Sequence, residues 1–395
     1  MEIEKLFKRK SLFNLREKKL NTKISNKIKK SSFLVIGGAG TIGQATVKEI
    51  FIRNPKKLHV VDINENNLVE LVRDIRSSAG YINGDFRTFV IDCGSSLFKT
   101  FFKNEGPYDY VLNLSALKHV RSERDIYSLI RMISTNVLNT EKIINLSINS
   151  KVKNFFSVST DKASNPINLM GCSKLLMEYM LQFNSKKINF SSARFANVAF
   201  SDGSLLHGFK ERFDKKQPLA APKDISRYFI SKKESGVLCL LSCLLGKPGD
   251  IFFPDIEKKL KAIFLHEIAV KFLKHKGFKA VVCKTENEAR KKFNNLFKKK
   301  EWPCYFFNSI STGEKKIEIF FSDSEKKKKS NLQNIGIVKS IIDIDKVKTL
   351  NILKFLKNKR FTNAQIKKND LIKFFKKNLK NFKHDELNKN LDEKM

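Results

Sequence analysis

The run Thr160-Asp161-Lys162 follows a short apolar stretch and could carry out proton transfer. Thr160 offers a hydroxyl that can bond a substrate oxygen. Asp161 and Lys162 place a carboxylate beside an amine, so that one can give a proton and the other can take one. Met170 follows, and Lys174 lies one helical turn beyond it, where an ammonium group could hold a ribose hydroxyl. By itself the run could equally be a surface turn with a solvated Asp-Lys pair, so its place in the fold decides.

A glycine-rich run at residues 37–43, GGAGTIG, could bind phosphates. Gly37 allows a tight turn, Gly40 lets backbone N–H groups approach a pyrophosphate, and Gly43 lets a helix pack closely on a strand. The N-terminus of the helix that follows adds partial positive charge. A glycine turn that binds nothing is the alternative, but the run lies between a predicted strand and a predicted helix, as a dinucleotide-binding loop does. The predicted contacts are Gly37, Gly40, Thr41, Ile42 and Gly43.

Acidic residues after the next two strands predict the rest of a dinucleotide site. Asp62 follows Gly43 by 19 residues, where its carboxylate can accept hydrogen bonds from the adenosine ribose hydroxyls. It would repel a 2′-phosphate, so the sequence favours NAD over NADP. Asp92, after the third strand, could meet the adenine edge. Ala116, after the fourth, is a further expected cofactor contact.

The elements that must position these residues alternate between strand and helix. Apolar runs predict strands at Phe33–Ile36, Leu58–Val61, Phe89–Ile91, Tyr110–Leu114, Asn154–Val158 and Asn189–Ala193. Helical spacing separates them, notably at Thr41–Arg53, Leu129–Ile148 and Ser173–Gln182. This order predicts an α/β fold with a Rossmann-like, doubly wound parallel sheet. Loops after the strands of such a sheet share one edge, which brings the Thr160 run to the cofactor and weighs against a plain surface turn.

The chain divides into four expected segments. We predict a basic N-terminal arm at 1–30 and an NAD-binding Rossmann domain with the catalytic residues at 31–195. Residues 196–325 should form mainly a smaller, substrate-binding subdomain, with helices near Glu234–Leu245 and His266–Lys276. Residues 326–395 are a Lys- and Asn-rich extension whose apolar spacing permits amphipathic helices.

Composition excludes some classes of protein. The 395 residues are 41% hydrophobic and 11% aromatic, which is too apolar for a disordered chain. The net charge of +37 suggests nucleic acid or an anionic surface. Lys supplies most of it, however, whereas readers of nucleic acid favour Arg. We therefore attribute the charge mainly to compositional drift and expect no nucleic-acid partner.

The location and the cysteines follow from simple patterns. No apolar run approaches the roughly 20 residues of a membrane span, and the N-terminus lacks a signal-peptide core. We expect a cytoplasmic protein without a membrane span. The six cysteines include no C-x-x-C pair, so we expect reduced, buried thiols and no metal site.

Six stretches carry a resemblance to a known family: VIGGAGTIGQ, NLSALKHVRSERD, STDKASNPINLMGCSK, SARFANVAFSDGS, SRYFISKKESG and STGEK. The chain resembles the extended short-chain dehydrogenase/reductases. Within them it resembles the UDP-N-acetylglucosamine 4,6-dehydratases of bacterial polysaccharide biosynthesis, from about residue 33 to about residue 320. The resemblance implies an NAD-dependent hydro-lyase that makes a UDP-4-keto-6-deoxy-N-acetylhexosamine. Most short-chain dehydrogenases have Tyr where this chain has Met170, but the branch that retains configuration at C5 also has Met.

The resemblance implies a mechanism with internal hydride transfer. Hydride leaves C4 of the sugar for NAD⁺ while the C4 hydroxyl loses its proton within the group of Thr160, Asp161 and Lys162. Lys162 then removes the C5 proton, Asp161 protonates the departing C6 hydroxyl, and the hydride returns to C6. As a base, Lys162 must be neutral, which burial or a nearby positive charge would favour. The implied catalytic set is Thr160, Asp161, Lys162, Met170 and Lys174.

The resemblance also implies substrate contacts and an assembly. Lys118, Asn197 and Arg227 match positions near the sugar or the phosphates, although plain surface basicity is a strong alternative for Lys118. Arg194 also lies in a substrate-side motif. Relatives have Asp where this chain has Ser309, which puts the C-terminal substrate contact in doubt. Helices near 130–148 and 173–182 pair relatives into dimers, so we expect a homo-oligomer.

Two other readings remain open. A nucleotide-sugar 4-epimerase would share the frame, but epimerases typically use the Tyr that is absent here, and an epimer keeps the mass of its substrate. A GDP-linked sugar is an alternative substrate. A non-catalytic NAD-binding scaffold with a basic, nucleic-acid-binding tail would bind DNA in a salt-sensitive way without sugar turnover.

Overall fold

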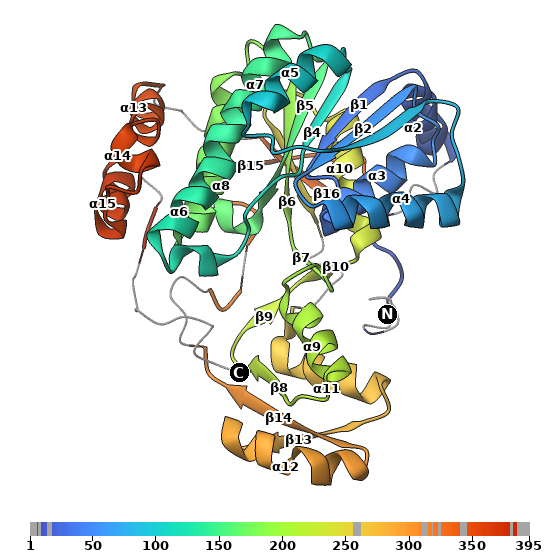
Figure 1. Ribbon diagram of the computed structural model, residues 1–395, viewed down its shortest axis with the longest axis vertical. Coiled ribbons are helices and arrows are strands. Elements are labelled where there is room, and N and C mark those ends of the chain that lie inside the picture. Colours follow the sequence, from blue (N-terminus) through green and yellow to red (C-terminus); the bar gives the residue numbers. More distant parts are fainter. Residues whose placement is uncertain are drawn as a thin grey trace.

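A nine-stranded sheet forms the centre of the protein in the computed structural model (Figure 1). The structure describes residues 6, 9–13, 18–255, 262–309, 315–317, 319–322, 325–339, 346–379 and 382–384. The strands lie in the order β15 (Lys326–Lys328), β16 (Ile335–Lys339), β11 (Asp250–Pro254), β6 (Phe190–Phe195), β5 (Asn154–Thr160), β4 (Tyr110–Asn113), β1 (Ser32–Ile36), β2 (Lys57–Asp62) and β3 (Asp85–Val90).

The strands from β3 to β11 are parallel, and the chain winds outward from β1 in both directions. This order confirms the predicted doubly wound α/β fold. The carboxyl ends of β1 and β4, where the winding changes direction, lie at the same edge of the sheet as the end of β5. A ligand of such a sheet binds at this edge.

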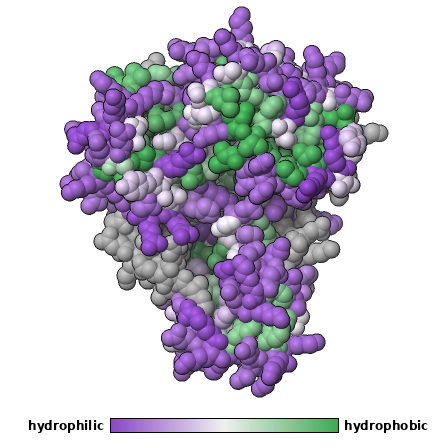
Figure 2. Space-filling model, in the orientation of Figure 1, coloured by the Kyte–Doolittle hydropathy of each residue, from purple (hydrophilic) through white to green (hydrophobic). Residues whose placement is uncertain are grey.

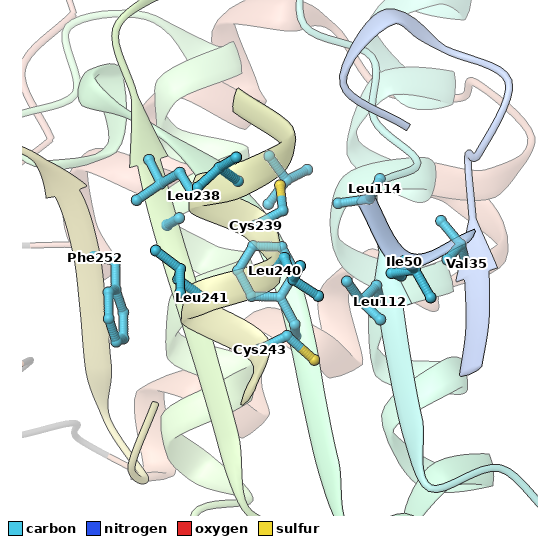
Figure 3. Close-up of a cluster of buried hydrophobic side chains, with 14 of the residues drawn as sticks. Val35, Ile50, Leu112, Leu114, Leu238, Cys239, Leu240, Leu241, Cys243 and Phe252 are labelled. Carbon is cyan, nitrogen blue, oxygen red and sulfur yellow. The ribbon is translucent and has the colours of Figure 1, made fainter. Parts of the chain in front are cut away.

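Helices cover both faces of the sheet, and each face has its own apolar core. One face carries α2 (Lys18–Lys29), α3 (Thr41–Phe51), α4 (Glu65–Ala79) and α10 (Lys232–Leu245). Figure 3 shows Leu238 and Leu241 of α10 near Phe252 of β11. The other face carries α5 (Ser96–Glu105), α6 (Ile126–Ile133), α7 (Thr140–Asn149) and α8 (Leu169–Phe183).

Two elements differ from the expectation. The third strand begins at Asp85 rather than Phe89, because β3 is an edge strand whose first residues are only half-buried and show no apolar run. The helix expected at Leu129–Ile148 is interrupted by a π-helical turn, Ser134–Asn139, between α6 and α7. Such a turn often marks a functional site.

A smaller unit lies beyond the carboxyl edge of the main sheet (Figure 1). Its parallel sheet has the order β13 (Lys279–Cys283), β14 (Glu301–Phe307) and β8 (Leu219–Pro222), with α9 (Leu205–Asp214), α11 (Leu265–His275) and α12 (Glu286–Lys298) around it. Trp302 is buried in its core. Figure 2 shows that the molecule narrows from the main sheet unit to the smaller unit, whose visible surface is largely hydrophilic. The helix α10 and the strand β11, although they lie in residues 196–325, belong to the main sheet unit.

The segment after residue 325 is built into the fold. We expected helices there, but β16 pairs antiparallel with β11, and β15 forms the outer edge. The burial of Ile335 and Val338 explains this pairing, whereas the exposed Lys residues of β15 suit an edge strand. The expected helices follow as α13 (Lys346–Leu356), α14 (Lys359–Thr362) and α15 (Lys368–Asn378). Within the described part of the chain, none of the helices is long and apolar enough to cross a membrane.

Candidate functional site

The glycine loop joins β1 to α3 at the edge where the winding changes direction. Gly37 has a φ of +75°, and an added Cβ would lie 2.5 Å from the backbone nitrogen of Ser115, directly after β4. At Gly43 a Cβ would lie 2.2 Å from the carbonyl oxygen of Gly37. At Gly40 it would meet only that same oxygen, at 3.6 Å. Gly37 and Gly43 are therefore required for close packing of the backbone, whereas Gly40 borders open space.

The residues around this open space suit a dinucleotide. Gly40 is the N-cap residue of α3 and has no side chain that could bond the N–H groups of the first turn. This turn begins with Thr41 and Ile42, two of the predicted cofactor contacts. Asp62 ends β2 beside the loop, where its Oδ2 accepts a hydrogen bond from the N–H of Ala39 at 2.9 Å. A carboxylate anchored in this way can still accept bonds from ribose hydroxyls. These residues fit NAD.

The two remaining cofactor candidates lie on neighbouring turns. Asp92 accepts a hydrogen bond from the N–H of Gly94 at 2.8 Å and faces Arg131 at 3.4 Å. The carboxylate of Asp92 therefore already has two partners within the protein, the N–H of Gly94 and the guanidinium of Arg131. Ala116 is half-buried next to Ser115, whose backbone nitrogen abuts Gly37, and so lies near the glycine loop.

The proton-transfer candidates meet at one carboxylate oxygen at the end of β5. Asp161 is 3% exposed, and its Oδ1 accepts hydrogen bonds from Thr160 Oγ1 at 2.9 Å and from Lys162 Nζ at 3.3 Å. Asp161 and Lys162 begin a 3-10 turn, Asp161–Ala163, which bends the chain away from the strand. The geometry joins a hydroxyl, a carboxylate and an amine in direct contact, so a proton can pass among them.

The helix α8 presents a buried polar row beside this group. Met170, Lys174 and Glu178 follow one another at a spacing of four residues, and all three are buried. The ammonium of Lys174 donates to the carbonyl oxygen of Val158 in β5 at 3.0 Å. Burial lowers the pKa of Lys174 to about 8, although the Glu178 carboxylate opposes the shift. The row thus places an ammonium group that can lose its proton near neutral pH next to the strand that carries Thr160.

The predicted substrate contacts lie on three separate segments. Lys118 follows β4 and is exposed as a whole, yet partial desolvation of its ammonium lowers its pKa, and nearby Asp202 opposes the shift. Asn197 lies in β7 (Asn197–Val198), and Arg227 lies in β9 (Ser226–Arg227). Arg227 is 6% exposed and donates to the carbonyl oxygens of Ser226 at 2.8 Å and Lys316 at 3.1 Å.

Arg194 lies in a motif that the resemblance places on the substrate side, but its own side chain faces the interior of the protein. Its side chain is 1% exposed and makes ion pairs of 2.7 Å with Glu178 of α8 and with Glu325. It also donates to the carbonyl oxygen of Phe320 at 2.9 Å. A guanidinium that is closed in by two carboxylates and a carbonyl cannot bind a substrate phosphate, so Arg194 holds the fold together. Of the expected substrate motif STGEK, residues 311–315, only Lys315 lies within the described residues, and Ser309 lies two positions before the motif.

Three polar residues near the site were missed by the sequence analysis. Asp202 accepts a hydrogen bond from Thr41 Oγ1 at 2.9 Å, which puts a carboxylate beside the glycine loop. Glu123 is buried and accepts a hydrogen bond from the N–H of Met170 at 2.9 Å. Asn136, in the π-helical turn, donates to the carbonyl oxygen of Leu117. Glu123 and Asp202 lie in two of the stretches that carry the family resemblance, which is the signal that could have found them, whereas the sequence analysis offered no such signal for Asn136.

Comparison with known proteins adds a family and several relatives. A model of the polysaccharide biosynthesis protein family matches residues 33–340. The chain is 35% identical over 260 residues to an uncharacterized membrane protein of Methanocaldococcus jannaschii, covering 63% of this chain and 75% of that protein. It is 27% identical to the capsular polysaccharide biosynthesis protein CapD of Staphylococcus aureus, covering 61% of this chain but only 41% of CapD. It is 26% identical to the UDP-N-acetylglucosamine 4,6-dehydratase (inverting) of Campylobacter jejuni, covering 60% and 71%.

Solved structures share the fold. The chain matches Pen from Bacillus thuringiensis with a TM-score of 0.63 and 22% identity, covering 80% of this chain and 89% of Pen. It matches the UDP-Glc/GlcNAc 4-epimerase of Campylobacter jejuni with a TM-score of 0.56 and 17% identity, covering 74% and 91%. At this level of identity the likeness shows the common fold.

Proposed function

Because the chain belongs to the polysaccharide biosynthesis protein family, we propose that it is a nucleotide-sugar 4,6-dehydratase that acts on UDP-N-acetylglucosamine. The observation that carries the proposal is the contact of Thr160 and Lys162 with the same oxygen of Asp161, at the edge of the sheet that holds the glycine loop. An acid and a base in contact at this edge are what an elimination of water requires.

Each residue of the cluster has a proposed role. Bound NAD would supply the hydride acceptor and donor that the reaction needs. Thr160 would bond the C4 hydroxyl and pass its proton to Asp161. Lys162 would remove the proton from C5, and Asp161 would protonate the C6 hydroxyl as it leaves. Lys162 would then give its proton back to C5 as the hydride returns to C6, so that Asp161 and Lys162, which lie in contact, both end the cycle in the protonation states in which they began.

The helix α8 supports the same chemistry. We propose that Lys174, fixed to β5 through the carbonyl oxygen of Val158, holds the nicotinamide ribose. Met170 is buried, has no proton to transfer, and occupies the position where a Tyr would compete with Asp161 as the acid. This favours retention of configuration at C5.

Cofactor and substrate preferences complete the proposal. Asp62 favours NAD over NADP because a carboxylate at the ribose repels a 2′-phosphate. Lys118, Asn197 and Arg227 are proposed substrate contacts, and a homo-oligomer is the proposed assembly. Asp92 is a weaker cofactor candidate, since Gly94 and Arg131 already partner its carboxylate.

Mass spectrometry tests the reaction. UDP-N-acetylglucosamine is incubated with the purified protein and NAD, and the product should have lost one water. NMR of the product then reports the configuration at C5. An isomer with unchanged mass and altered C4 would indicate an epimerase, and an unchanged sugar would overturn both readings.

A matched pair of variants tests the role of the base. Lys162→Met should reduce turnover by about 10²–10⁴-fold, because it removes a general base, yet leave NAD binding intact. Lys186→Met, which changes the same residue type at an exposed position after α8, should turn over like the parent. Turnover of Lys162→Met at the parent rate would exclude Lys162 as the base.

A further inference from the structure

The C-terminal helices lie against the helix that carries the proposed catalytic residues. The helices α13 to α15 stand beside α6 and α8 in Figure 1. Ile352, Leu356 and Phe375 of these helices are fully buried in the same apolar core as Met177 of α8. Basic residues elsewhere on these helices face solvent, so the segment is amphipathic. Its apolar side packs against the core that includes α8.

The chain after α15 returns to the proposed catalytic loop at residues 161–170. The backbone N–H of Lys383 donates to the carbonyl oxygen of Pro166 at 3.1 Å. The next residue, His384, is 3% exposed, and its Nε2 lies 3.7 Å from Oε2 of Glu123. Lys376 of α15 donates to the carbonyl oxygen of His384 at 2.8 Å, which fixes this end to the helix before it.

Glu123 connects this end of the chain to α8. It is 4% exposed, and its two oxygens face different segments. Oε2 faces His384, while Oε1 accepts a hydrogen bond from the N–H of Met170 at 2.9 Å, in the first turn of α8. A negative charge at a helix N-terminus is favourable, and a buried carboxylate that lost its partners would be costly. The position of one carboxylate therefore depends on both the C-terminal end and the catalytic helix.

Three consecutive residues of the loop are each held by a different distant part of the chain. Ser164 Oγ donates to the carbonyl oxygen of Ile319 at 2.9 Å. The carbonyl oxygen of Asn165 accepts from Nζ of Lys315. The carbonyl oxygen of Pro166 accepts from Lys383. Each contact spans at least 150 residues of chain. Distant parts of the chain therefore fix these three residues in addition to local bonds such as that from Ser164 Oγ to the carbonyl oxygen of Asp161.

We propose that residues 382–384, together with Glu123, position the loop at residues 161–170 and the first turn of α8, so that the C-terminal segment is part of the catalytic site. Glu123 and His384 are positioning residues, because they act through Met170 and the loop rather than on the substrate. The inference that these residues affect catalysis rests on the proposed function. The inference that they hold the loop and the start of α8 in place does not. Misplacing catalytic groups by about 1 Å can cost about 10²-fold in rate.

Point variants of the full chain test the proposal, because removing α13 to α15 would expose the apolar core beneath them. Glu123→Ala should lower kcat by about 10- to 100-fold with KM nearly unchanged. Glu123→Gln keeps an acceptor for the N–H of Met170 and should recover most of the lost rate. His384→Ala should lower kcat less than Glu123→Ala does. Lys357→Ala removes an exposed ion pair between the residue directly after α13 and Glu141, and it should leave kcat unchanged.

Hydrogen exchange gives a readout that does not need the reaction. In Glu123→Ala and His384→Ala, the amides of residues 161–171 should exchange faster than in the parent, while those of β1 and α3 stay the same. If the parent makes no dehydrated sugar but the exchange pattern appears, the proposed function fails and the positioning role stands.

The double variant Glu123→Ala/His384→Ala completes the test. Coupled residues should show a combined loss of rate smaller than the product of the single losses. Exchange at residues 161–171 that is unchanged in both single variants would overturn the proposal. So would a loss that appears only as lower stability, with kcat of the folded protein intact.

Discussion

The glycine loop and the proposed catalytic loop lie at the same edge of one sheet but are held in place differently. The glycine loop is held mainly by its own turn and the adjoining strand, through the close packing of Gly43 on the carbonyl oxygen of Gly37 and the bond from Ala39 to Asp62. Its distant contacts are with Ser115 and Asp202. The loop at residues 161–170 is held from residues 315–319 and 383. The row on α8 likewise depends on Arg194 and Glu325.

The difference shows which part of the site can vary on its own. A loop that is held by local contacts keeps its geometry wherever the strand–turn–helix unit forms. A loop that is held from distant segments keeps its geometry only when the whole chain has folded. Changes in the segments after residue 315 should therefore lower the turnover rate before they weaken the binding of the cofactor.

The largest expected effect is on the buried ion pairs under the catalytic helix. Glu178→Ala removes a carboxylate that accepts two bonds from Arg194 and one from Ser159. It should lower the free energy of unfolding by about 3–5 kcal/mol, because it leaves a buried guanidinium short of a partner. Urea unfolding measures the loss. Glu141→Ala, which breaks the more exposed pair with Lys357, should cost no more than about 1 kcal/mol. Equal losses of stability in the two variants would contradict the structural role of the buried pair between Glu178 and Arg194.

A second pair of variants separates packing from ligand binding in the glycine loop. Gly43→Ala should lower the free energy of unfolding by about 1–3 kcal/mol, because its Cβ would press on backbone atoms that cannot move aside. Gly40→Ala has room for its Cβ and should cost at most about 1 kcal/mol. Its effect should instead be weaker NAD binding, measured by calorimetry. NAD binding that is normal in Gly40→Ala would place the phosphates elsewhere.

The smallest expected effect is a pH dependence that comes from Lys174. Its pKa is lowered from 10.5 to about 8 by burial, so between these values the unfolded chain binds more protons than the folded one. Stability must then rise with pH across this window, by about 2 kcal/mol between pH 8 and pH 10 from this group. Urea unfolding of the parent and of Lys174→Met, compared at the two pH values, isolates the contribution of Lys174 to the free energy of unfolding. A variant that shows the same rise as the parent would contradict it.

The predicted parts of the site are those with a local pattern. The apolar run before Gly37, the glycine spacing and Asp62 each follow from the alternation of strand and helix, and the structure places all of them at one edge. Thr160 to Lys162 were found in the same way, since they follow a buried strand. The structural role of Arg194 could not be predicted, because its motif is local but its partners, Glu178 and Glu325, lie elsewhere in the chain.

The sequence by itself therefore determined the α/β order and the position of the glycine loop, and it singled out the side chains that are proposed to react. Only the tertiary structure decided that Arg194 is a structural ion, that Glu123 holds the start of α8, and that Lys383 reaches Pro166. The physical reason is that periodicity reports which face of an element is buried, not which distant residue covers it. A buried charge stays in the fold only beside its partner, and that partner becomes visible only once the chain is folded.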